Sequence, residues 1–113
     1  MASTVRALVR EMQTEIRDAD LQPTRAAELL MKLTALLGNC AEEIRRCDHA
    51  YAEILLAYLS TEETANRAKI HAETSREYLA KREARDTKEL VTELIRSLKY
   101  LLRTHEEEMR LSR

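Results

Sequence analysis

A row of residues spaced alternately by four and three positions runs through the middle of this 113-residue chain. The first part of the row consists of Ala26, Leu30, Leu33, Leu37, Cys40, Ile44, Cys47, Tyr51, Ile54 and Tyr58. Side chains at this spacing lie on one face of a helix slightly underwound to about 3.5 residues per turn, which is typical of a helix packed along another helix. The same frame continues through smaller residues, namely Thr61, Ala65, Ala68, Ala72 and Ser75, to Leu79.

The composition agrees with long helices and disfavours a sheet protein. The chain has one Gly, one Pro, no Trp and no Phe, and 35% of its residues are charged. Turn-forming and aromatic residues are what a sheet protein needs, whereas Ala, Leu, Glu, Lys and Arg favour helices. We therefore predict an all-α fold in which residues 1–113 form a single domain.

A short first helix is predicted over residues 4–18. Val5, Leu8, Val9, Met12 and Ile16 form one apolar stripe at helical spacing. A helix of about four turns is marginal by itself, so it must pack on another part of the chain. Pro23 suits the first turn of a new helix and marks where the long helix begins.

The long helix is predicted over residues 23–83, with possible kinks at 38–39 and at 60. The cap-like spacing of Ser60 and Glu63 leaves a separate helix over 60–83 as the alternative. The frame breaks near residues 82–88, and a third helix is predicted over 87–111, where a new apolar row begins at Val91. This helix is expected to fold back along the long one. The expected architecture is a long, coiled-coil-like helical hairpin with a short N-terminal helix, roughly 80–90 Å in length at 1.5 Å per residue.

The residues associated with catalysis and metal binding do not fall into a known arrangement. None of the three histidines follows Glu or Asp by three residues, as a di-iron bundle requires. His49 and Glu53 are four apart, which favours a solvated pair. One glycine is too few for a phosphate-binding loop. We expect no enzyme, no catalytic residue, no metal and no cofactor.

Cys40 and Cys47 lie on the same helix face, two turns apart. That separation is roughly 10 Å, which is too long for a disulfide within one helix. One interpretation is that both are small buried apolar residues in a reducing cytoplasm. The other is a disulfide across the axis of a symmetric dimer.

The widest part of the apolar face predicts an oligomer interface. Leu29 and Leu36 broaden the row beyond what one antiparallel helix would cover. We therefore expect a homo-oligomer that packs through Leu29, Leu30, Leu33, Leu37, Ile44, Tyr51, Ile54 and Tyr58.

The segment 60–79 keeps the helical frame but offers only small side chains, which leaves a surface for another protein. Beside it, Arg76, Tyr78 and Leu79 combine an arginine, a tyrosine and an aliphatic residue. Such side chains are often dominant at protein interfaces, so these three are the predicted partner-binding residues. The partner is expected to be a protein, bound stoichiometrically.

Nucleic-acid binding is the alternative function. Net charge is −1, which gives no overall field toward nucleic acid or an anionic membrane. Basic side chains at near-helical spacing nevertheless suit phosphate contacts. The candidate residues are Arg67, Lys69, Lys81, Arg96 and Lys99. The competing interpretation is an ordinary solvated face, because acids are interspersed among them.

The second half of the chain resembles small helical accessory proteins of tailed bacteriophages, encoded near early or recombination genes. The similarity covers about residues 50–113 and rests on Lys69, Glu73, Ser75, Tyr78, Arg96, Leu98 and Lys99. The resemblance implies a bacterial host cytoplasm and an inhibitor or adaptor that binds a host or phage protein. No apolar run is long enough to span a membrane, so no membrane association is expected.

Overall fold

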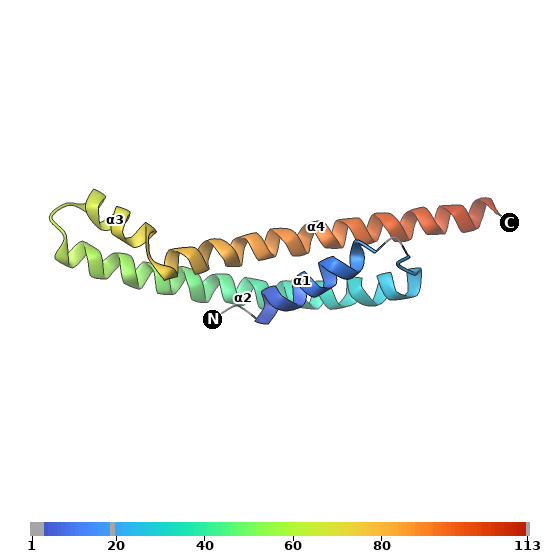
Figure 1. Cartoon of the computed structure of the whole chain (residues 1–113), viewed down its shortest axis with the longest axis horizontal. Coiled ribbons are helices and arrows are strands. Elements are labelled where there is room, and N and C mark those ends of the chain that lie inside the picture. The colour runs from blue at the N-terminus through green and yellow to red at the C-terminus, as the bar shows by residue number, and fades with distance from the viewer. Residues whose placement is uncertain (1–3, 19, 113) are drawn as a thin grey trace.

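Two long helices lie side by side in opposite directions over the middle of the molecule (Figure 1). The structure, a computed structural model, describes residues 4–18 and 20–112. Within these residues the helices are α1 (Thr4–Ile16), α2 (Pro23–Thr61), α3 (Ala65–Glu73) and α4 (Arg76–Leu111). The predicted all-α helical hairpin is confirmed. Its arms are α2 on one side and α3 followed by α4 on the other.

The chain reverses at residues 62–64, so the prediction of one helix over 23–83 is wrong. Glu62 leaves the helix with extended backbone angles, and Thr64 is also extended. The side chain of Thr64 accepts a hydrogen bond from the backbone N–H of Arg67 at 3.1 Å, which caps the start of α3. The repeating frame passes through this turn because α3 packs the same small row, Ala68 and Ala72, back against α2.

Helix α4 continues through residues 82–88, where a break was predicted. That prediction followed the frame of α2, which would place Arg82, Asp86 and Glu89 on the inner face. In the structure Ala84 and Thr87 are buried instead, and they lead into Val91 at the same helical spacing. The inner face of α4 therefore begins earlier than the run of large apolar residues does. At Gly38, by contrast, α2 continues as a helix.

The core is shared by three helices at one end of the hairpin. Val9 of α1 is fully buried there, as are Leu29 and Leu33 of α2 and Val91 and Leu98 of α4. Burial of such a side chain stabilises the fold by about 1.5–3 kcal/mol. This cluster explains why α1, too short to be stable alone, remains helical.

Polar contacts hold both ends of α1 against the long helices. Near its start, Arg6 Nη1 donates to Thr87 Oγ1 at 3.0 Å and to the Glu83 carbonyl at 3.3 Å. Near its end, Glu15 accepts two hydrogen bonds from Arg25 of α2. The predicted packing of the first helix is thereby confirmed, with its end at Ile16 rather than 18.

The molecule measures 73 × 22 × 21 Å, which is shorter than the expected 80–90 Å. The difference follows from the reversal at 62–64, since α2 has 39 residues instead of about 60. None of the described helices is long and apolar enough to cross a membrane.

Candidate functional site

The junction between α3 and α4, here called the elbow (residues 73–82), brings the predicted partner-binding residues together. Ser75 interrupts the helix with extended backbone angles, and its Oγ accepts from the backbone N–H of Tyr78 at 3.2 Å. The same hydroxyl donates to the carbonyl of Ala72, the last buried residue of α3. Ser75 therefore satisfies both helix ends and fixes the direction in which α4 begins.

Tyr78 anchors the elbow to α2 through an aromatic contact. Its ring centroid lies 5.4 Å from that of Tyr51, with the planes tilted by 46°. The guanidinium of Arg82 lies 5.9 Å from the ring of Tyr78, and Lys81 Nζ lies 4.5 Å from the ring of Tyr51. These are cation–π distances. Burial raises the pKa of Tyr51 above its ordinary 10, and the nearby Glu73 carboxylate acts in the same direction.

A shallow depression of about 380 Å³ lies at the elbow, and all three predicted partner-binding residues line it. Arg76 is exposed, and Leu79 is 59% exposed although it is a large aliphatic residue. Tyr78 is half-buried because of its contact with Tyr51. Tyr78 therefore also contributes to folding, since an aromatic pair stabilises the fold by about 0.5–1.5 kcal/mol.

The predicted oligomer interface is largely used within the chain itself. Leu29 and Leu33 are 0% exposed in the three-helix core, so they are not available to a second copy of this folded hairpin. The face is broader than one antiparallel helix covers, but α1 and α4 of the same chain cover these two residues together. Leu30 and Leu37 are partly buried and pack against the same core.

The other four residues of the predicted oligomer interface lie in the second half of α2, nearer the reversal at residues 62–64. Ile44, Tyr51, Ile54 and Tyr58 are all half-buried. The ring of Tyr58 is stacked on that of His71 of α3, with centroids 5.4 Å apart and planes 19° apart. His71 Nε2 in turn lies 3.4 Å from a carboxylate oxygen of Glu62. Tyr51 and Tyr58 thus contact α4 and α3 of their own chain, respectively.

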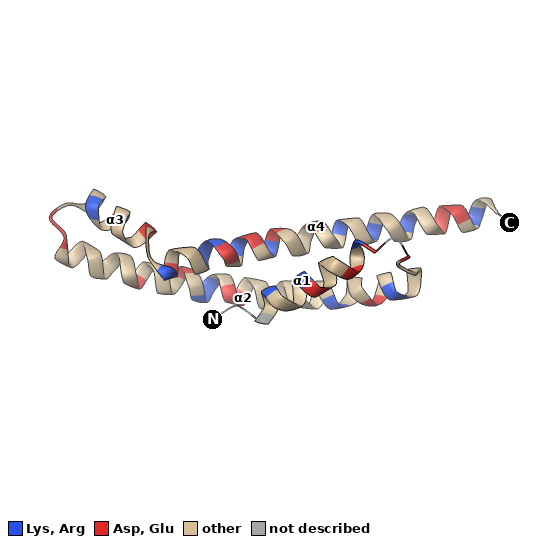
Figure 2. Ribbon diagram, viewed as in Figure 1, with Lys and Arg blue, Asp and Glu red and all other residues tan. Residues whose placement is uncertain are grey.

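The candidate nucleic-acid residues are dispersed along the molecule. Arg67 and Lys69 are exposed on α3, whereas Arg96 and Lys99 are exposed on the C-terminal half of α4. Lys81 lies between them over the Tyr51 ring. Figure 2 shows basic and acidic residues interspersed along the first half of α4, and farther along Arg96 Nη1 pairs with Glu93 at 2.7 Å. The structure does not gather these cations into one patch.

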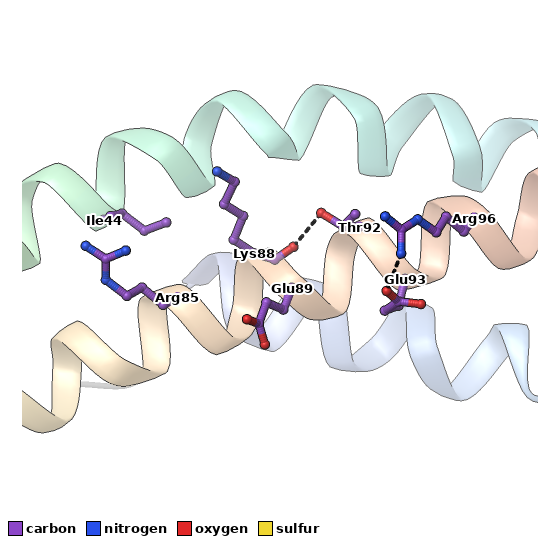
Figure 3. A pocket seen from close by; sticks show the side chains of 7 residues that line it. All are labelled: Ile44, Arg85, Lys88, Glu89, Thr92, Glu93 and Arg96. Atoms are coloured by element: carbon purple, nitrogen blue, oxygen red, sulfur yellow. Dashed lines mark hydrogen bonds and ion pairs between the residues drawn. The ribbon is translucent and has the colours of Figure 1, made fainter.

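A cleft of about 550 Å³ between α2 and α4 was not anticipated from the sequence (Figure 3). It is lined by Ile44, Arg85, Lys88, Glu89, Thr92, Glu93 and Arg96. The α4 side of the cleft could have been predicted from the sequence, because its residues recur every three or four positions and so share one helix face. Arg85 pairs with Asp48 at 2.8 Å, and the lining carries both signs of charge, so the cleft selects no single charged ligand.

The cysteines and histidines are placed individually. Cys40 is 2% exposed, Cys47 is half-buried, and both are free thiols. Burial raises the pKa of each thiol, which makes them less reactive. His49 Nε2 lies 3.0 Å from Glu53 as an exposed pair on α2. Within residues 4–18 and 20–112, no three His, Cys, Asp or Glu side chains are grouped as metal ligands would be.

Comparison with known proteins adds no further constraint on the site. No protein-family model, no curated protein and no solved structure matches this chain.

Proposed function

We propose that this is a non-enzymatic interaction protein that binds a protein partner at the elbow. One observation carries the proposal: Arg76, Tyr78 and Leu79 line a single depression on the surface of the hairpin. The core does not use Leu79, which is 59% exposed. Arginine and tyrosine are enriched at binding hot spots, and the exposed side chain of Leu79 adds apolar area in the same depression.

The rigidity of the elbow also supports partner binding. The ring of Tyr78 packs against the ring of Tyr51 on α2, and Ser75 caps the first turn of α4. A surface that is already in its binding conformation loses little conformational entropy when a partner binds. The same residues would be poor candidates on a free helix end, where that entropy would oppose binding.

The protein would act stoichiometrically, as an inhibitor or adaptor. In the setting implied by the phage resemblance, it would be an accessory factor in the bacterial host cytoplasm that occupies a host or phage protein. We do not extend the proposal to nucleic acid, because Arg67 and Arg96 lie on opposite halves of the returning arm.

A matched pair of double variants tests the proposal. Arg76→Ala with Leu79→Ser alters the elbow, and Arg67→Ala with Ile70→Ser makes the same changes at the same spacing on α3. All four residues are exposed, so both variants should keep wild-type helicity by circular dichroism. Tyr78 is left intact because of its contact with Tyr51.

Tagged wild type would first be used to isolate a partner from bacterial lysate, and the affinity of that purified partner would then be measured. We expect the elbow variant to bind roughly 30-fold more weakly, which corresponds to the loss of about 2 kcal/mol at a hot spot. The α3 variant should bind like wild type. Equal affinity of the partner for all three proteins would refute the proposal.

A further inference from the structure

The reversal between α2 and α3 is made of residues that can equally form a helix. Residues 62–64 are Glu, Glu and Thr, with neither Gly nor Pro among them. Glu62 has φ −91° and ψ 152°, and Thr64 has φ −132° and ψ 151°. Both residues are in the extended region, which any residue adopts. A change mainly in their ψ angles would convert them to the helical region.

The repeat of small residues is in phase on both sides of the turn. The positions Tyr58, Thr61, Ala65, Ala68 and Ala72 are spaced by three and four without interruption. If residues 62–64 became helical, α2 and α3 would form one helix with this row on a single face. Glu63 and Arg67 would then be four residues apart within that helix, in the favourable order for an ion pair.

Most of the contacts that hold α3 in place are made to α2. Ala68 and Ala72 are buried, the His71 ring is stacked on Tyr58, and His71 Nε2 lies 3.4 Å from Glu62. The α2 surface of a second copy presents the same side chains. A chain opened at residues 62–64 can therefore recover these contacts from another copy of itself.

We propose that the partner for the opened hairpin is a second copy of this chain, and that the two exchange arms. In the dimer, residues 62–64 are helical, and α3 and α4 of each copy pack on α1 and α2 of the other. The Tyr51–Tyr78 contact and the Asp48–Arg85 pair then form between copies. Exchange of identical elements is a low-cost route to a dimer because almost every contact of the monomer is kept.

This arrangement gives the predicted oligomer residues a role that the closed hairpin does not. Leu29, Leu33 and Tyr58 pack on the arm that would come from the other copy. Where the two straightened segments cross, Thr61 and Ala65 of one copy face the same residues of the other. Side chains of this size allow the two helices to approach closely.

A proline variant separates the closed hairpin from the exchanged dimer. Ala65 is the first residue of α3 and is exposed, and Thr64 before it has the extended angles that a following proline requires. Ala65→Pro thus fits the closed chain but breaks a continuous helix. Arg76→Pro is the matched control, because it also lies at a first helical position, after extended Ser75, and outside residues 62–64.

The proteins would be unfolded, refolded at millimolar concentration and separated by size exclusion with light scattering. We expect wild type and Arg76→Pro to give a slowly exchanging species at twice the mass of one chain. For Ala65→Pro, the association constant of this dimer should be roughly a hundredfold or more lower than for wild type, with unchanged helicity. Thr64→Ala removes the cap of the closed form and should favour the dimer about fivefold per chain. A monomeric Thr64→Ala protein, or equal dimer in Ala65→Pro and wild type, would overturn the proposal.

A cross-link identifies exchange directly within the dimer fraction. Two chains lacking the native cysteines, one with Asp48→Cys and the other with Arg85→Cys, would be refolded together. In the hairpin, Arg85 Nη2 lies 2.8 Å from Asp48 Oδ2, so the two positions face each other across the arms. In the exchanged dimer, a short bis-maleimide should therefore join the two different chains. Failure of this cross-link in the dimer, when a single chain carrying both cysteines is cross-linked efficiently as a monomer, would exclude exchange.

Discussion

At the scale of single residues, Glu15 and Arg25 join the end of α1 to the start of α2. Arg25 Nη2 donates to Glu15 Oε1 at 3.0 Å, its Nε donates to the other oxygen, and its Nη1 donates to Glu28. These hydrogen bonds, with the guanidinium charge, lower the pKa of Glu15 from its ordinary 4.5. The charged carboxylate is therefore favoured in the folded state.

A pH-dependent loss of stability follows from this pair. A lowered pKa in the folded state adds stability above the unfolded pKa near 4.5, and that stability is lost as the pH falls through the folded value. Glu15→Gln should be less stable than wild type at pH 7, and the difference should shrink below pH 4.5. Urea denaturation between pH 3 and 7 measures it. A difference that stays constant with pH would contradict the assignment, and Glu11→Gln on the same helix serves as the control.

At the scale of the elements, two hydroxyl side chains define the returning arm. Thr64 caps α3 and Ser75 caps α4, each by accepting a hydrogen bond from the backbone N–H three residues later. Without these caps the exposed N–H groups at both helix starts would have to be satisfied by water. These two local interactions therefore stabilise the starts of α3 and α4 by about 1 kcal/mol each.

Replacement of Ala65 by proline should stabilise the protein, because the restricted backbone lowers the entropy of the unfolded chain. The expected gain is about 0.4–1 kcal/mol, measured by urea denaturation at low protein concentration. Ala80→Pro, inside α4, is the comparison and should cost about 3 kcal/mol or more. If both substitutions destabilised the protein equally, a continuous helix through residue 65 would be indicated.

At the scale of the whole molecule, stability is concentrated at the three-helix end. The large buried side chains lie there, whereas the buried residues of α3 are two alanines. The hairpin therefore has a stable base and a less stable tip, and segments with few buried contacts open most readily. The elbow lies between these two regions.

Truncation of Leu33 should destabilise the entire molecule. Leu33 is 0% exposed in the core that α1, α2 and α4 share, so Leu33→Ala should cost about 2–5 kcal/mol. Met31, two residues away and 75% exposed, is the control, and Met31→Ala should change the stability by no more than about 0.5 kcal/mol. Urea titration followed by circular dichroism provides both values. Comparable effects of the two variants would show that Leu33 is not in the core.

Parts of the candidate site could be predicted from residue types alone. Arg76, Tyr78 and Leu79 were identified by their chemistry, and the structure places them around one depression. The role of Tyr78 in packing was not predictable, because Tyr51 is 27 positions away in the sequence and meets it only after the chain reverses. The cleft of Figure 3 was missed for a related reason, since Ile44 comes from the other arm.

The sequence alone determined that the chain is helical, that α1 packs on other helices and that two long arms lie together. Those properties follow from side-chain periodicity, and burial of an apolar face outweighs any local alternative. The position of the reversal was decided only by the tertiary structure. Residues 62–64 suit a helix or a turn, and a cap worth about 1 kcal/mol does not by itself choose between them. The closed chain reverses there because residues 65–111 then bury Ala68 and Ala72 on α2 and Val91 and Leu98 in the core, contacts made between segments distant in sequence.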